Sequence, residues 1–136
     1  MITKIRNRMV SDEKGFTLIE MLIVIIILGI LLAIAVPAYL KFKDRANQGA
    51  AQANIRAMVP AMEAFNADNG ALGYAGMTIG TAVTGLQAKY DSALKGAPAV
   101  TILSAAAATY CVRSSVGNAT YYKSGPGSEI STTACT

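Results

Sequence analysis

The sequence contains no histidine, and charged residues make up only 15% of its 136 positions. Without histidine the chain lacks the side chain that most often serves as a general base or as a nitrogen ligand of zinc. It also lacks a G-x-S-x-G nucleophile motif. The glycines at 70–80 precede no phosphate-binding lysine, so we interpret them as a flexible loop. We therefore expect no enzyme activity, no cofactor and no metal site.

A strong excess of charge of either sign is missing too. The net charge is +4, and half of it falls in residues 1–15. This balance is too weak to indicate nucleic acid as a main partner. Arg113 and Lys123 are expected to share an exposed face, which a solvated surface explains better than a DNA receptor. Only one carboxylate, that of Glu129, follows Cys111, and a single carboxylate makes a poor calcium site.

Cysteine is scarce: Cys111 and Cys135 are the only two, so one intrachain pairing exists. Outside the cytoplasm they are expected to form a disulfide, which would stabilise the domain by about 3 kcal/mol in the chain-entropy model. In a cytosolic domain they would stay buried as free thiols. The membrane segment described next favours the disulfide.

What the chain does have is a long apolar run. Residues 21–40 carry no charge, and as a helix they would be about 30 Å long, the thickness of a bilayer core. Three interpretations compete: a secretory signal cleaved after Ala35, a plain single-span anchor, and a segment that leaves the bilayer to pack in an assembly. The run is longer than the apolar part of a usual signal peptide, and it begins beside a carboxylate, that of Glu20.

The apolar run continues into an amphipathic pattern, so we predict one long, bent helix over residues 16–69. Apolar residues recur at helical spacing in its second half, and this face should pack on the rest of the domain. Pro37 and Pro60 should bend the helix, and Gly70 should end it. The apolar face consists of Ile55, Met58, Val59, Met62 and Phe65.

The period then changes to that of strands. We predict a short helix at 86–94, strands at 99–103, 109–114 and 119–123, and an edge strand within 129–135. A turn at 116–118 would join the second and third strands as a hairpin. The fold class is therefore α+β, with the distal half of the helix on a small antiparallel sheet.

Two further patterns lie in the hairpin. Tyr110, Tyr121 and Tyr122 are expected to pack in the core or pair across strands. Residues 118–120 match an N-glycosylation sequon, a three-residue pattern that arises often by chance.

Glu20 favours the assembling segment over the plain anchor. A carboxylate at the middle of a membrane helix costs about 2.5–3.5 kcal/mol, and near one end it costs less. If the chain were cut after Gly15, the new α-amine of Phe16 would be a cationic partner. In an assembly Glu20 of one subunit would pair with this amine on its neighbour and so set the axial register.

These residues resemble the class III signal of type IV prepilins and related pseudopilins. The resemblance covers about residues 13–40 and rests on Lys14-Gly15, then Phe16-Thr17-Leu18-Ile19-Glu20-Met21-Leu22-Ile23-Val24, with Pro37 further on. It implies cleavage between Gly15 and Phe16, N-methylation of Phe16 by the same membrane peptidase system, and a pilin fold. It also implies a helical filament made of copies of this chain, built by an assembly platform and a cytoplasmic motor.

The resemblance also divides the chain. Residues 1–15 would be a cleaved leader, 16–40 the transmembrane and filament-core half of the helix, and 41–136 an extracytoplasmic domain. The precursor would sit in the inner membrane with its N-terminus in the cytoplasm before joining a surface pilus. Its cysteine pair is similar to that of type IVa major pilins. A type II secretion pseudopilin and a DNA-uptake pilin remain alternatives, because they share the N-terminal signal.

Overall fold

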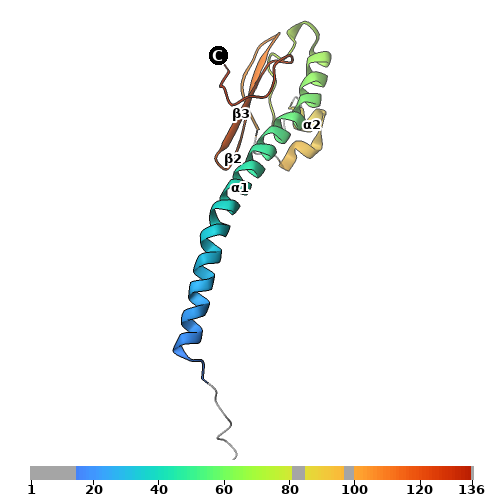
Figure 1. Cartoon of the computed structure of the whole chain (residues 1–136). Coiled ribbons are helices and arrows are strands. Elements are labelled where there is room, and N and C mark those ends of the chain that lie inside the picture. Colours follow the sequence, from blue (N-terminus) through green and yellow to red (C-terminus); the bar gives the residue numbers. More distant parts are fainter. Residues whose placement is uncertain (1–14, 81–84, 97–99, 136) are drawn as a thin grey trace, which may run out of the picture. The chain divides into compact units, whose positions relative to one another are not determined.

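The computed structural model describes residues 15–80, 85–96 and 100–135. The predicted leader therefore lies outside the described residues except for Gly15, and so does Ala99, where the first strand was expected to begin. Internal contacts divide the chain into two units, Met1–Leu40 and Lys41–Thr136. Figure 1 follows the described elements along the chain.

Helix α1, Leu18–Asn69, runs through both units. It ends where the sequence predicted and begins two residues later than predicted. It continues through Pro37 and Pro60 without interruption, so each proline costs the helix one backbone bond but does not end it. By length and composition α1 is able to cross a membrane, and none of its most apolar window is buried. A bend at either proline stays a prediction.

The second unit has its core on one face of α1. The buried residues of the helix are Ala51, Ile55, Met58, Ala61 and Met62. Ala51, Ile55, Met58 and Met62 recur every three or four positions, as one face of a helix requires, and Ala61 lies beside them. This confirms the predicted apolar face, of which Val59 and Phe65 are partly buried at its margin.

The core face of α1 packs with residues of a three-stranded antiparallel sheet, ordered β1-β2-β3. Its strands are β1, Val100–Ala105, β2, Tyr110–Val116, and β3, Ala119–Ser124. The predicted hairpin is confirmed: Val116 pairs with Ala119, and Gly117 has the positive φ, 57°, that such a turn demands. β1 carries an irregularity between Ile102 and Ser104.

The register of the hairpin assigns its side chains to two faces. Val112 pairs with Lys123, and Arg113 pairs with Tyr122. Since successive side chains alternate across a sheet, Lys123 shares the core face of Val112, whereas Arg113 lies on the opposite face. The predicted basic patch of Arg113 and Lys123 is therefore wrong.

The predicted edge strand within 129–135 is also wrong. Among the described residues this segment forms a single bridge, between Tyr122 and Ser131, with backbone bonds of 2.7 and 2.9 Å. Cys135 is joined to Cys111 on β2, and their Cα atoms lie 6.0 Å apart. An edge strand beside β3 would lie two strand spacings from β2, about 9.6 Å. The segment therefore leaves the edge to reach its partner.

The predicted helix at 86–94 is split in two. It consists of α2, Leu86–Lys89, and a 3-10 helix, Ser92–Gly96. Asp91 causes the break, because its Oδ1 accepts a hydrogen bond from the Ala93 amide at 2.8 Å and so starts a new turn. Leu86 and Leu94 nevertheless both reach the core.

Candidate processing and assembly site

The residues of the predicted cleavage site precede the helix. Gly15, Phe16 and Thr17 have no regular secondary structure, and α1 begins at the next residue. Phe16 is 76% exposed, and no atom of the described residues lies within 4 Å of the position that a Cβ on Gly15 would occupy. The peptide bond between Gly15 and Phe16 is thus outside the helix and open to an enzyme.

Thr17 and Glu20 form a reciprocal cap at the start of α1. The Thr17 amide and hydroxyl both donate to Glu20 Oε2 at 2.8 Å. In return the Glu20 amide donates to the Thr17 hydroxyl oxygen at 3.2 Å. This is the capping box, which pairs amide groups that the first turn of a helix leaves without partners.

The sequence analysis missed this cap, although its signal is present. Threonine followed three residues later by glutamate, directly before an apolar run, is the pattern of a capping box. Glu20 therefore acts at the helix start through its hydrogen bonds with Thr17 as well as through its charge. The cap explains why the helix begins at Leu18 and not at Phe16.

The apolar surface of residues 16–40 is exposed throughout. Every large apolar side chain of this segment, from Phe16 to Leu40, is at least 45% exposed. Burial of apolar surface is worth about 25 cal/mol per Å², so this segment needs either lipid or protein around it. Pro37 lies inside the segment and, like its neighbours, is exposed.

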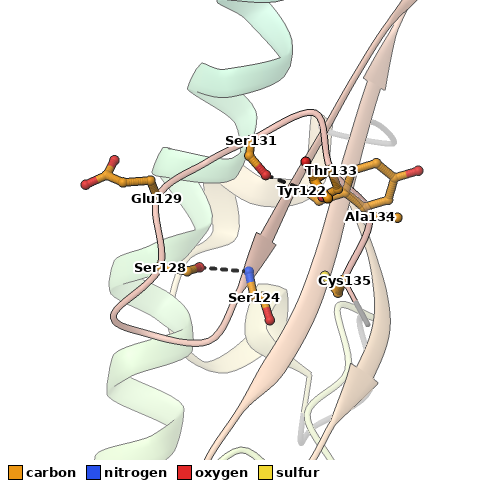
Figure 2. Close-up of a pocket in the computed structure, with 8 residues that line it drawn as sticks. All are labelled: Tyr122, Ser124, Ser128, Glu129, Ser131, Thr133, Ala134 and Cys135. Atoms are coloured by element: carbon orange, nitrogen blue, oxygen red, sulfur yellow. Dashed lines mark hydrogen bonds between the residues drawn. The ribbon is translucent and has the colours of Figure 1, made fainter.

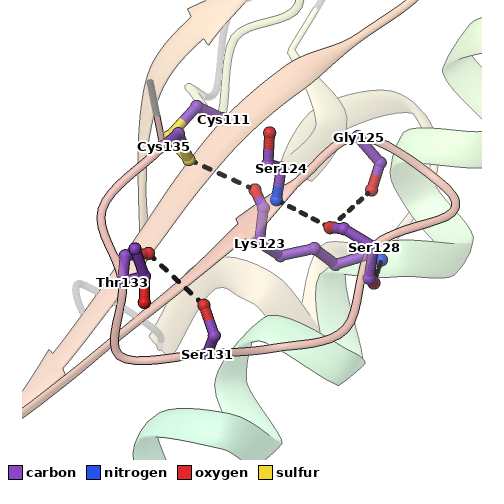
Figure 3. The surroundings of a disulfide bond; sticks show 8 residues. All are labelled: Cys111, Lys123, Ser124, Gly125, Ser128, Ser131, Thr133 and Cys135. Carbon is purple, nitrogen blue, oxygen red and sulfur yellow. Dashed lines mark hydrogen bonds between the residues drawn. A yellow bond between two sulfur atoms is a disulfide. The ribbon is translucent and has the colours of Figure 1, made fainter.

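The two cysteines are joined, as the sequence predicted. The disulfide between Cys111 and Cys135 closes the C-terminal segment onto the outer face of the sheet (Figure 3). Sγ of Cys135 lies 3.7 Å from the carbonyl oxygen of Lys123, a contact and not a hydrogen bond, because a disulfide sulfur carries no proton. Cys111 is buried beneath this segment.

Lys123 holds the turn that precedes this segment. Its side chain is only 7% exposed, and its ammonium donates to the carbonyl oxygens of Pro126 at 3.2 Å and Ser128 at 2.6 Å. The Ser128 hydroxyl oxygen accepts a further bond from the Ser124 amide at 2.9 Å. Lys123 is therefore a structural residue and not part of a receptor surface.

A pocket of about 190 Å³ lies beside the C-terminal segment (Figure 2). Hydroxyl groups dominate its lining, and its only carboxylate, that of Glu129, points away from the other labelled side chains. Within the described residues, no three His, Cys, Asp or Glu side chains lie close enough together to hold a metal ion.

The predicted tyrosines divide between the two faces of the hairpin. Tyr110 is buried and packs edge-on against Tyr74, with ring centroids 4.8 Å apart. The Tyr74 hydroxyl donates to Glu63 at 2.7 Å, and burial together with this carboxylate raises the pKa of Tyr74 to about 12. Burial likewise raises the pKa of Tyr110. Both rings thus act as neutral core residues, while Tyr122 lies on the outer face.

The family described as "Prokaryotic N-terminal methylation motif" matches residues 10–36, which include Gly15, Phe16 and Glu20. The type IV wide pilus major component PilA4 of Thermus thermophilus is 37% identical over 105 residues, which cover 74% of this chain and 72% of that protein. The chain belongs to the type IV pilin family. The match to PilA4 extends beyond the apolar helix into the domain.

Other relatives match a shorter part of the chain. The type IV major pilin protein PilA of Myxococcus xanthus is 44% identical over 59 residues, 43% of this chain and 27% of that protein. The type II secretion system core protein G of Pseudomonas aeruginosa is 41% identical over 58 residues, 43% of this chain and 41% of that protein. The chain thus spans well under two thirds of the length of these relatives. No solved structure matches it.

Proposed function

We propose that the chain is a structural subunit that polymerises into a type IV pilus on the cell surface after its leader is removed. The observation that carries the proposal is the fully exposed apolar helix of residues 16–40 joined to a folded α+β domain. The helix serves first as a membrane anchor and then as the core of a filament. Residues 41–136 form the extracytoplasmic domain that covers this core.

The proposed processing cuts the bond between Gly15 and Phe16. Support comes from the exposed, non-helical conformation of this segment and from the methylation motif that matches around it. A membrane prepilin peptidase would remove residues 1–15 and methylate the new amine of Phe16. The inner membrane would hold the precursor until then.

Glu20 is proposed to guide assembly. Its Oε2 is occupied by Thr17, which leaves the negative charge without a cation in the described residues near it. The Phe16 amine of a neighbouring copy would supply that cation inside the apolar bundle, where an unpaired ion is costly. Lipid and protein interiors are similarly apolar, so hydrophobicity alone drives little association between membrane helices. A directional ion pair therefore gives the assembly its register.

Pro37 is proposed to help α1 adapt to the bundle. It removes one backbone hydrogen bond from the helix, so the stretch from Gly29 to Pro37 is easier to unwind than its surroundings. An assembly platform and a cytoplasmic motor would supply the work of extraction.

Nothing in the chain supports a nucleic-acid partner.

A secretion pseudopilin is the second candidate, because core proteins G of type II secretion systems are among the relatives. The two functions predict different behaviour. Filaments sheared from the cell surface and composed of this chain would support the pilus. Absence of such filaments, with stability that requires calcium, would support the pseudopilin instead.

A further inference from the structure

Three cations follow the apolar run within five positions. Lys41, Lys43 and Arg45, here called the basic trio, are all exposed at the start of the second unit. Phe42 lies among them and is 71% exposed. Lysine and arginine next to an aromatic ring, directly after an apolar span, form the residue pattern of a membrane–water interface.

The one acid within this stretch faces the hairpin of the domain. Asp44 Oδ1 accepts a hydrogen bond from the Asn118 side-chain amide at 2.9 Å, and Asn118 accepts one from Asn47 at 3.2 Å. Asp44 is half-buried, whereas all members of the basic trio are exposed. The sequence shows three cations and one acid in this stretch. In the structure the acid is hydrogen-bonded to Asn118 in the hairpin turn, while the three cations remain exposed.

The basic trio has no acidic partner in the described part of the chain. The one ion pair found there joins Lys89 and Asp68. Together with the Asp44 carboxylate, which keeps its charge when it accepts a bond from a neutral amide, the three cations leave a local positive charge at this end of the apolar run. Such a charge beside an apolar span suits the phosphate groups of a lipid surface.

We propose that the basic trio binds the phosphate groups of anionic phospholipids, at the leaflet surface where the apolar run ends. Long lysine and arginine side chains lie along apolar surface while their charged ends reach the headgroups. Phe42 would rest at the same level. The contacts would fix the depth of the subunit in the bilayer and would have to break when it is extracted. This inference rests on the proposed function, which places residues 16–40 in a membrane.

The test uses the full chain in vesicles made of equal parts phosphatidylglycerol and phosphatidylcholine. Electron paramagnetic resonance with spin-labelled versions of the two lipids measures which of them the protein immobilises. We expect a preference for phosphatidylglycerol of at least about fivefold at low salt, since one cation at the surface contributes about that factor. The preference should fall sharply at about 1 M salt, where the Debye length is about 3 Å.

Matched variants make the assignment specific. Lys41→Gln with Lys43→Gln and Arg45→Gln should lower the preference sharply, although the cations of residues 1–15 remain. Arg113→Gln, on the outer face of the sheet, should leave it unchanged. Asp44→Asn should instead raise the preference, because it removes the one negative charge of this stretch. A preference for phosphatidylglycerol that is the same in the triple variant as in the native chain would overturn the proposal.

The remaining outcomes separate this inference from the proposed function. A chain that inserts into the mixed vesicles, resists alkaline extraction and shows no preference for either lipid would overturn the lipid contact alone. A triple variant that keeps the lipid preference but forms no filaments would assign the trio to contacts between copies, and would overturn it as well. A chain that does not insert at all would overturn the membrane anchor and this inference together.

Discussion

Thr17 and Glu20 act as one unit at the start of α1, because the side chain of each accepts a hydrogen bond from the backbone amide of the other. Thr17→Val keeps the shape of the side chain but removes the hydroxyl. We expect it to weaken the first turn by about 1 kcal/mol, the usual value of such a cap. Amide hydrogen exchange at residues 18–21 of the detergent-solubilised chain should then accelerate about fivefold. Thr17→Ser is the control; equal exchange in all three proteins would refute the cap.

Gly73 and Gly76 both adopt positive φ, 56° and 79°, but only one is crowded. A Cβ on Gly73 would overlap the carbonyl oxygen of Ala107, whereas one on Gly76 meets open space. Gly76→Ala should therefore cost about 1 kcal/mol of backbone strain. Gly73→Ala should cost a further 1–3 kcal/mol, roughly, because two backbone segments must separate. Urea unfolding compares them, and equal losses would contradict the close approach of these loops.

The residues of the N-terminal methylation motif could be found from sequence because the motif is defined by residue type and order alone. Lys123 could not be placed from its charge, since its role depends on the register of the hairpin. In the register that the Gly117 turn sets, Lys123 pairs with Val112. The two side chains therefore share the core face of the sheet. The carbonyl groups of Pro126 and Ser128, which it binds, have no sequence signal.

At the scale of elements, α2 is fastened to the end of α1 by charge. Asp68 accepts bonds from Lys89 at 2.9 Å and from the Tyr90 hydroxyl at 3.0 Å. The hydrogen bond to Lys89 lowers the pKa of Asp68 below 3.8; the same bond raises the pKa of Lys89 above 10.5. Between pH 3.8 and pH 10.5 Asp68 is therefore negative and Lys89 positive, and the ion pair is intact.

It follows that α2 should loosen at both extremes of pH. Below pH 3.8 the contribution of Asp68 declines as the pH falls through its folded pKa; above pH 10.5 that of Lys89 declines as the pH rises through its own. NMR chemical shifts of residues 86–89 should report both changes. Asp68→Asn should remove the acid transition, and its persistence in that variant would show that another group is responsible.

The C-terminal segment depends on its disulfide. Among the residues that the structure describes, one bridge, between Tyr122 and Ser131, ties it to the sheet by backbone bonds. Cys111→Ser with Cys135→Ser should lower the free energy of unfolding by about 3 kcal/mol. Exchange of the Tyr122 amide should accelerate at the same time. Reduction of the native chain should reproduce both effects; an unchanged unfolding curve would contradict the assignment.

Elements with local signals were predictable, and those shaped by distant contacts were not. The long helix, its core face and the hairpin follow from periodicity and from Gly117. The segment from Glu129 to Cys135 has the composition of a strand, but the need to reach Cys111 on β2 draws it off the edge. The helix expected at 86–94 was broken by Asp91, whose side chain caps a new turn.

For the whole molecule, Glu20 tests how copies assemble. Glu20→Gln keeps the size of the side chain and can still accept bonds from Thr17, but it removes the charge. We expect this variant to insert into the membrane and to yield at least about tenfold fewer filaments, since removing one partner of a buried ion pair leaves the other charge unpaired at a cost of more than about 1.4 kcal/mol. Electron microscopy of sheared filaments measures the yield. Assembly at the native rate and register would exclude the pairing with a neighbour's amine.

The chain is proposed to be cut after Gly15 and then built into a surface filament. The intact mass of the protein in sheared filaments tests it most directly. We expect a chain that starts at Phe16, carries one added methyl group and lacks the two hydrogens lost in the Cys111–Cys135 disulfide. A mass that retains residues 1–15, or one that corresponds to cleavage after Ala35, would contradict it.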